Sequence, residues 1–177
     1  MSKKRQRNCK PWQTRGFFIL SMLSILVISG AIVATVLLYG GKDENIIIAD
    51  SVWLDENIWR VQSYKQRKDG KYDVRLLDIQ TAYESSFEEL CETYRTTPYS
   101  AFNSYNVRDG VGCQGMVCYI ASWCDRNAYE YSVAWTPTHV WIYVEYGDIW
   151  YKFDFASSGA TLSEVMQRDV QKGMVLE

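Results

Sequence analysis

The chain has 177 residues, of which 47% are hydrophobic and 15% aromatic, and its formal net charge is −2 at pH 7. All the acidic residues follow position 41, so residues 42–177 carry a formal charge of −8. An acidic portion of this length has room for one hydrophobic core and lacks the basic surface that nucleic acids require, so a single domain with no nucleic-acid partner is expected.

The N-terminus predicts a membrane anchor. Residues 1–15 are basic, and residues 16–41 contain no charged side chain. A helix needs about 20 apolar residues to cross a bilayer, whereas the apolar core of a cleaved signal peptide is only about 7–15 residues long. We therefore expect a cytoplasmic tail (1–15), an uncleaved transmembrane helix (16–41) and an extracytoplasmic domain (42–177), because basic flanks stay on the cytoplasmic side. The protein is then a single-pass protein of the cell membrane, with the lipid bilayer as a partner. The alternative is that residues 16–41 belong to a signal peptide that is cleaved.

The outer domain is predicted to begin with a hairpin. Residues 46–59 mix apolar and acidic side chains, and their pattern favours neither strand nor helix. Residues 61–65 and 72–76 are predicted strands on either side of Asp69-Gly70. An Asp-Gly pair between such segments is a strong hairpin signal.

Two helices are predicted next. Ser85 and Ser86 can cap the first, apolar residues follow from Phe87 at helical spacing, and Pro98 ends it. The second begins near Cys113, because apolar side chains share one helical face beyond it. These are Met116, Val117, Ile120, Trp123 and Cys124.

The remaining pattern predicts an antiparallel meander. Alternation favours strands over residues 129–135, 138–146 and 149–155, with a tight turn at Gly147. Ser158-Gly159 is expected to end the sheet, and residues 162–170 to form a short helix. The predicted class is α+β, with a helix preceding a meander of strands.

The spacing of the cysteines argues against a metal site. Cys9 precedes the apolar segment, Cys91, Cys113, Cys118 and Cys124 follow it, and no pair has C-x-x-C spacing. The chain has one histidine, so no metal and no other cofactor is expected. If Cys113 is catalytic, at most one disulfide can form among the other three outer cysteines, which we expect instead to be small buried residues.

Three residues in the C-terminal half have the chemistry of a cysteine acyl-transfer site. Cys113 lies at a predicted helix start, where its thiolate is favoured; His139 can take its proton, and Asp154 can hold the imidazole. Counting outward from the turn at Gly147 brings His139 and Asp154 together across two strands. A lone cysteine or histidine is more often a packing residue, but the order of all three favours a catalytic triad.

The surroundings of Cys113 suggest further roles. Gly112 and Gly115 leave room for a substrate backbone, and the Cys113 N–H can donate to an oxyanion. Three upstream residues could supply a second donor, and the sequence singles out none of them: Asn103, Tyr105 and Asn106. Three tryptophans can either line a peptide groove or pack in the core: Trp123, Trp135 and Trp141.

These segments together resemble the transglutaminase-like superfamily. The likeness rests on Gly112-Cys113-Gln114-Gly115, His139-Val140-Trp141 and Trp150-Tyr151-Lys152-Phe153-Asp154, within about residues 110–157. It implies a papain-like core, in which a helix that carries the cysteine at its N-terminus packs on a small antiparallel sheet. It also implies an enzyme with Cys113 as nucleophile, His139 as base and Asp154 as orienting carboxylate. Such an enzyme acts on peptide or protein amide bonds through a thioester, ending in hydrolysis or acyl transfer.

Three alternatives use the same residues. Cell-wall cysteine peptidases of the NlpC type share the order of cysteine and histidine, but their nucleophile usually follows Asp and precedes Ser-Gly. A catalytically silent transglutaminase-like binding or scaffolding module on a membrane anchor would keep the fold without the reaction. A redox protein using Cys113 with Cys118 is disfavoured, because their spacing puts them on different helix faces.

Overall fold

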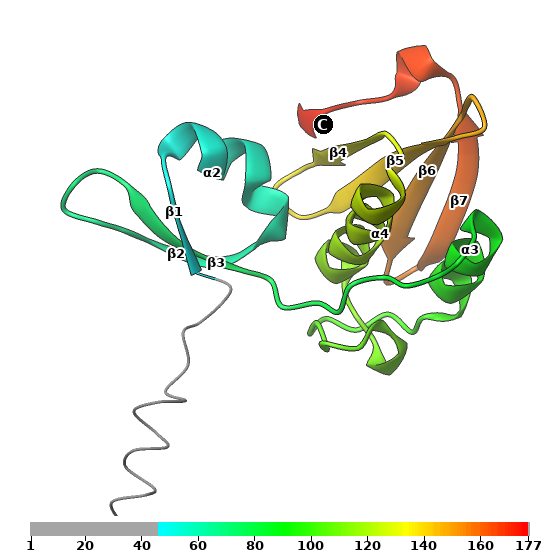
Figure 1. Ribbon diagram of the computed structural model, residues 1–177, viewed down its shortest axis with the longest axis horizontal. Helices are drawn as coiled ribbons and strands as arrows, with labels where there is room; N and C mark the ends of the chain where they lie inside the picture. The colour runs from blue at the N-terminus through cyan, green and yellow to red at the C-terminus, as the bar shows by residue number, and fades with distance from the viewer. Residues whose placement is uncertain (1–45, 177) are drawn as a thin grey trace, which may run out of the picture. The chain divides into compact units, whose positions relative to one another are not determined.

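The computed structural model describes residues 46–176 as an α+β domain with two mainly antiparallel sheets (Figure 1). The predicted class is therefore confirmed. Within this range no helix has both the length and the apolar character needed to cross a membrane. The expected tail at residues 1–15 and anchor at residues 16–41 lie outside the described residues.

The first sheet has the strand order β1-β3-β2 and packs against helix α2. Asp50 caps α2 by accepting a hydrogen bond from the Trp53 N–H at 2.8 Å. A small core of its own holds this unit together, and Val74 on the central strand is fully buried within it. In chain order the elements are β1 (Ile46–Ala49), α2 (Ser51–Asn57), a 3-10 turn (Ile58–Arg60), β2 (Val61–Gln66) and β3 (Tyr72–Leu76).

The structure confirms the hairpin predicted around Asp69-Gly70. β2 and β3 pair antiparallel, and Gly70 adopts a left-handed φ of 82° in the turn between them. The ambiguous segment 46–59 contains both a strand and a helix. Its mixed pattern thus came from two short elements that follow one another.

Helix α3 (Phe87–Thr96) begins and ends where the sequence predicts. The hydroxyl of Ser86 accepts from the Glu89 N–H at 3.2 Å, while the Glu89 carboxylate accepts from the Ser85 N–H at 2.8 Å. This reciprocal arrangement satisfies free N–H groups at the helix start. Its apolar face, including Phe87 and Leu90, is buried.

Helix α4 (Cys113–Asn127) is the main helix of the core. All five residues of its predicted apolar face are buried, and Trp123 stacks on Tyr129 with ring centroids 5.0 Å apart. The helix ends at Ala128, which adopts the left-handed conformation at φ 58° while its N–H donates to the carbonyl of Cys124.

The second sheet has the strand order β7-β6-β5-β4-β8. Helices α3 and α4 lie on the same side of it (Figure 1), and α4 packs on β5 and β6. The turn predicted at Gly147 joins β5 to β6, with positive φ at both Gly147 and Asp148. The strands are β4 (Tyr131–Trp135), β5 (Val140–Tyr146), β6 (Ile149–Ala156), β7 (Gly159–Val165) and β8 (Gly173–Met174).

The prediction for the C-terminal residues was wrong. Ser158-Gly159 does not end the sheet, because it turns β6 into β7, and residues 162–165 are strand rather than helix. Leu162 faces the main core while Val165 packs on the opposite face of the sheet. Side chains that alternate between two faces are typical of a strand, and the rest of the predicted helix contains only a 3-10 turn (Gln167–Asp169).

The left-handed end of α4 gives a stability prediction. An L-residue other than glycine pays about 1–2 kcal/mol for this conformation. Ala128→Gly is therefore expected to raise the free energy of unfolding by about 1 kcal/mol, measured by urea unfolding. The same substitution inside the helix, Ala121→Gly, is the control and should lower it by about 1 kcal/mol. Equal effects of the two substitutions would contradict the assigned helix end.

Candidate active site

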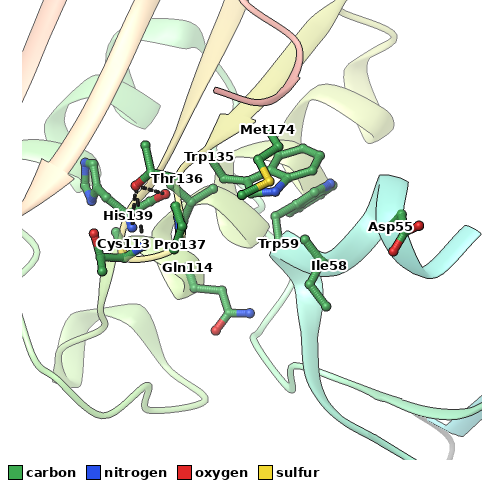
Figure 2. Close-up of a pocket in the computed structure, with 12 residues that line it drawn as sticks. Asp55, Ile58, Trp59, Cys113, Gln114, Trp135, Thr136, Pro137, His139 and Met174 are labelled. Atoms are coloured by element: carbon green, nitrogen blue, oxygen red, sulfur yellow. Dashed lines mark hydrogen bonds between the residues drawn. The ribbon is translucent and has the colours of Figure 1, made fainter. Parts of the chain in front are cut away.

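The candidate residues lie at a pocket of about 580 Å³. Cys113 and His139 line one end of it, Asp55 lies at the other end, and Trp59 and Trp135 lie between them (Figure 2). The volume is typical of sites that hold a small ligand or part of a peptide. The pocket walls come from α2 and its 3-10 turn, the start of α4, the segment from β4 to β5, and β8.

Cys113 is the first residue of α4 and is partly exposed. Gly112 precedes it in an extended conformation with no side-chain cap, and its own N–H donates to Oδ1 of Asn103 at 2.8 Å. The backbone N–H groups of the first helical turn are not used by the helix itself. The Cys113 thiol therefore lies beside a local positive dipole and beside its own N–H, a potential oxyanion donor.

The two glycines around Cys113 have a different purpose from the one expected. Both are buried, and a β-carbon on Gly115 would overlap Oδ1 of Asn103. The space that a substrate backbone was expected to use is thus filled by Asn103. The glycines let the upstream loop pack tightly against the helix start and fix the position of Cys113.

His139 is held in a turn that leads into β5. Its backbone N–H donates to Oγ1 of Thr136 at 3.1 Å, and its carbonyl accepts from the Thr136 N–H at 2.8 Å. The imidazole lies over the ring of Trp141 with centroids 5.8 Å apart. The backbone and the ring of the only histidine in the sequence are both restrained.

Nε2 of His139 and Oδ1 of Asp154 are 2.7 Å apart. The pairing of β5 with β6 sets Ile142 opposite Phe153, so one step further Asp154 faces Trp141 and lies diagonal to His139 on the same face of the sheet. Asp154 accepts from Nε2–H and leaves Nδ1 as the nitrogen free to meet a thiol. The closeness predicted by counting from the turn is present.

Lys152 is a site residue that the sequence reasoning missed. Its Nζ lies 2.9 Å from Oδ2 of Asp154 and 4.8 Å from the centre of the Trp141 ring. Both carboxylate oxygens of Asp154 are therefore occupied. Lys152 and Asp154 are two apart on a predicted strand, so strand alternation already placed them on one face.

The charges around Asp154 decide its protonation. Burial alone would raise the pKa of this carboxyl, but the hydrogen bonds from His139 and Lys152, together with their charges, hold the pKa below its usual range. Asp154 therefore stays ionised throughout the neutral range and can stabilise an imidazolium beside it.

Cys113 and His139 line the same pocket, but no hydrogen bond joins the thiol to the imidazole in this structure. Catalytic hydrogen bonds often tighten only when substrate binds. The structure thus brings His139 and Asp154 into direct contact, and it brings Cys113 to the same cavity.

The other described cysteines, Cys91, Cys118 and Cys124, are free thiols. Burial raises the pKa of Cys118 and of Cys124 to about 12, and it also raises the pKa of Cys91. These thiols are protonated at neutral pH and therefore poor nucleophiles. Within residues 46–176 no cluster of three or more His, Cys, Asp or Glu could hold a metal ion.

The structure distinguishes the candidates for the second oxyanion donor and for the peptide groove. Of the three possible oxyanion donors, Asn103 contacts the Cys113 loop, Asn106 caps a 3-10 turn (Val107–Asp109), and Tyr105 is largely exposed. Of the three tryptophans, only Trp135 lines the pocket. Trp123 and Trp141 are buried, as their packing alternative predicted.

Comparisons of the chain with protein-family models, with curated proteins and with solved structures find no match.

The carboxylate of Asp154 gives a pH-dependent prediction. The pKa of Asp154 in the folded protein lies below the value of about 4 expected for the unfolded chain. The ionised carboxylate therefore stabilises the folded protein above about pH 4. This stabilisation is lost as the pH falls through the pKa of the folded state. Asp154→Asn should lower the free energy of unfolding by roughly 1–3 kcal/mol at neutral pH, and the difference should shrink below about pH 4. Urea unfolding over a pH series measures it.

The control for this experiment is Asp78→Asn, the same change at an exposed carboxylate. It should leave the free energy of unfolding within about 0.5 kcal/mol of the wild type. A destabilisation by Asp154→Asn that stays constant from pH 8 to pH 3 would show that the charge of Asp154 makes no contribution.

The contact between Gly115 and Asn103 gives a second prediction for the site. Gly115→Ala should cost about 1–3 kcal/mol through overpacking, although alanine favours helix. In an Asn103→Ala background most of this cost should disappear, since the overlapping amide is gone. A double-mutant cycle by urea unfolding measures the coupling. Additive effects of the two substitutions would mean that Asn103 does not occupy the space beside Gly115.

Proposed function

We propose that the protein is a membrane-anchored, extracytoplasmic, transglutaminase-like cysteine enzyme that acts on peptide or protein amide bonds through a thioester. The observation that carries the proposal is the 2.7 Å hydrogen bond between His139 and Asp154 at the pocket that Cys113 also lines. A half-buried carboxylate on an imidazole, with a thiol at the same pocket, supplies the groups that thiol acyl transfer needs.

The fold around the site supports the same proposal. Cys113 begins the helix that packs on β5 and β6, and His139 and Asp154 come from the adjoining ends of these two strands. This is the helix-on-sheet arrangement expected for a papain-like core. The anchor at residues 16–41, with the N-terminus in the cytoplasm, is proposed from sequence alone.

The proposed reaction starts from a thiolate–imidazolium pair of Cys113 and His139. The thiolate adds to the amide carbonyl, and the Cys113 N–H stabilises the oxyanion. His139 gives its proton to the departing nitrogen as the C–N bond breaks, which leaves an acyl thioester and an amine. His139 then takes a proton from water or a second amine, whose attack releases the acyl product and restores the thiolate.

Asp154 and Lys152 have positioning roles in this scheme. Asp154 fixes Nε2 of His139, so Nδ1 is directed to the thiol, and it offsets the positive charge that forms on the ring. Lys152 holds the second carboxylate oxygen, which restricts rotation of Asp154. Neither side chain contacts the reacting carbonyl in the proposed mechanism.

The proposal predicts selective alkylation of Cys113. A free thiol has a pKa of about 8.5. Iodoacetamide should label Cys113 in the full-length protein at pH values well below this. His139→Ala should slow labelling at pH 6.5 at least tenfold, and Asp154→Asn should slow it by a smaller factor. Peptide mapping by mass spectrometry measures the rate at each cysteine.

Cys113→Ser provides the background rate of the other thiols, among which Cys91, Cys118 and Cys124 should react slowly because burial disfavours their thiolate forms. Slow labelling of Cys113 that ignores both substitutions would instead favour the silent binding module on a membrane anchor.

A further inference from the structure

The pocket extends from Cys113 to a second wall, which lies outside the region that resembles the transglutaminase-like core. Asp55, Ile58 and Trp59 form this wall at the end of α2 and in the 3-10 turn after it. They face the segment that carries His139 across the pocket (Figure 2). A substrate bound at Cys113 would therefore extend along residues contributed by the smaller sheet unit.

The middle of the pocket is apolar. Ile58 and Trp59 on one side, with Trp135 and Met174 on the other, line it between the two ends. Gly173 and Met174 pair in parallel with Ala134 and Trp135, so strand pairing holds Met174 beside Trp135. Burial of a leucine-sized or aromatic side chain against such a surface contributes about 1.5–3 kcal/mol when complete.

The wall is fixed to the helix that bears the proposed nucleophile. Gln114, the residue after Cys113, donates from Nε2 to the carbonyl of Val61 at 3.0 Å. Trp59 packs against the main core, whereas its neighbour Ile58 packs against the core of the smaller sheet. The 3-10 turn therefore joins both cores, so the distance between the wall and Cys113 is set by packed contacts.

The far end of the pocket carries a negative charge. Among residues 46–176, Asp55 is the only acidic residue that lines the cavity, and it is exposed. The outer domain as a whole is also acidic. A basic group on the substrate would be favoured there and an acidic group disfavoured, with a modest, salt-dependent energy because the site is open to solvent.

We propose that this site selects an extended peptide that is apolar where it crosses Ile58 and Trp59 and basic where it reaches Asp55. The assignment deepens the proposed function and rests on it, since it concerns substrates of the same thiol. Trp59 determines the apolar preference and Asp55 the charge preference.

Reactive peptides test the assignment without a known substrate. One set carries an N-terminal chloroacetyl group and the other a C-terminal chloromethyl ketone, so that Cys113 is approached from either chain direction. Each peptide has seven residues and is based on alanine. One position carries Leu or Ser, and another carries Lys, norleucine or Glu. Both positions are moved along the peptide from one member of the set to the next. The measured quantity is the second-order rate of Cys113 alkylation in the full-length protein, with iodoacetamide as reference.

The best peptide with Leu and Lys should react at least tenfold faster than its counterpart with Ser and Glu. Trp59→Ala should remove most of the Leu advantage. Asp55→Lys should reverse the order of the Lys and Glu peptides, and 0.5 M NaCl should reduce that preference. The reversal is informative even if other variants fold poorly, because misfolding does not create a new preference.

Two matched controls accompany these variants. Tyr64→Ala removes an exposed aromatic side chain of the same sheet unit, and Glu56→Lys makes the same charge change one residue from Asp55; neither residue lines the pocket. Both should keep the wild-type preferences and the wild-type iodoacetamide rate. Equal rates for all peptides, with rapid iodoacetamide labelling of Cys113, would overturn the assignment and leave the proposed function standing. Failure of iodoacetamide to label Cys113 would overturn both.

Discussion

The carboxylate of Asp154 organises the candidate site, because each of its oxygens holds a different side chain. Oδ1 binds the imidazole of His139 at 2.7 Å and Oδ2 binds the ammonium of Lys152 at 2.9 Å. Trp141 lies under both partners. The side chain of Asp154 is only 24% exposed, and a charge at such a position is costly unless it is paired. The two partners offset this cost. The same pairing keeps the group ionised and fixes which nitrogen of His139 is left for chemistry.

Two other restraints hold Cys113 at the pocket that His139 also lines. Asn103 fills the space beside Gly115 and binds the N–H of Gly112, which fixes the start of α4. Gln114 ties the same helical turn to the carbonyl of Val61 in the smaller sheet unit. The residues on either side of Cys113 thus hold the helix start in place, and Cys113 itself lines the pocket. A site on the end of a packed helix is more rigid than one on a free loop.

The sequence predicted the elements whose local pattern agrees with their tertiary surroundings. The start of α3 at Ser86, the buried face of α4 and the turn at Gly147 all follow from capping, periodicity and turn chemistry. The closeness of His139 and Asp154 also followed, because a two-residue turn fixes the register of the strands beyond it. The strand over residues 159–165 was missed, since its apolar residues are few and its pairing with β6 decides its form.

The parts of the site that could not be predicted depend on long-range contacts. Nothing in the local sequence of Asp55 or Trp59 indicates that they line the pocket, because the wall exists only when the smaller sheet packs near α4. The true use of Gly115 likewise depends on Asn103, twelve positions upstream. Lys152 is the exception, since its place two residues before Asp154 on one strand was already visible.

The most direct test of the central claim is to trap the acyl-enzyme. Full-length protein is incubated with a pool of peptides, quenched with acid, and digested for mass spectrometry of the fragment that contains Cys113. We predict a peptide-derived adduct on Cys113 that hydroxylamine removes, as expected for a thioester, and that is strongly reduced in His139→Ala. Product formation without any such adduct, or with equal turnover by Cys113→Ser, would contradict the proposed mechanism.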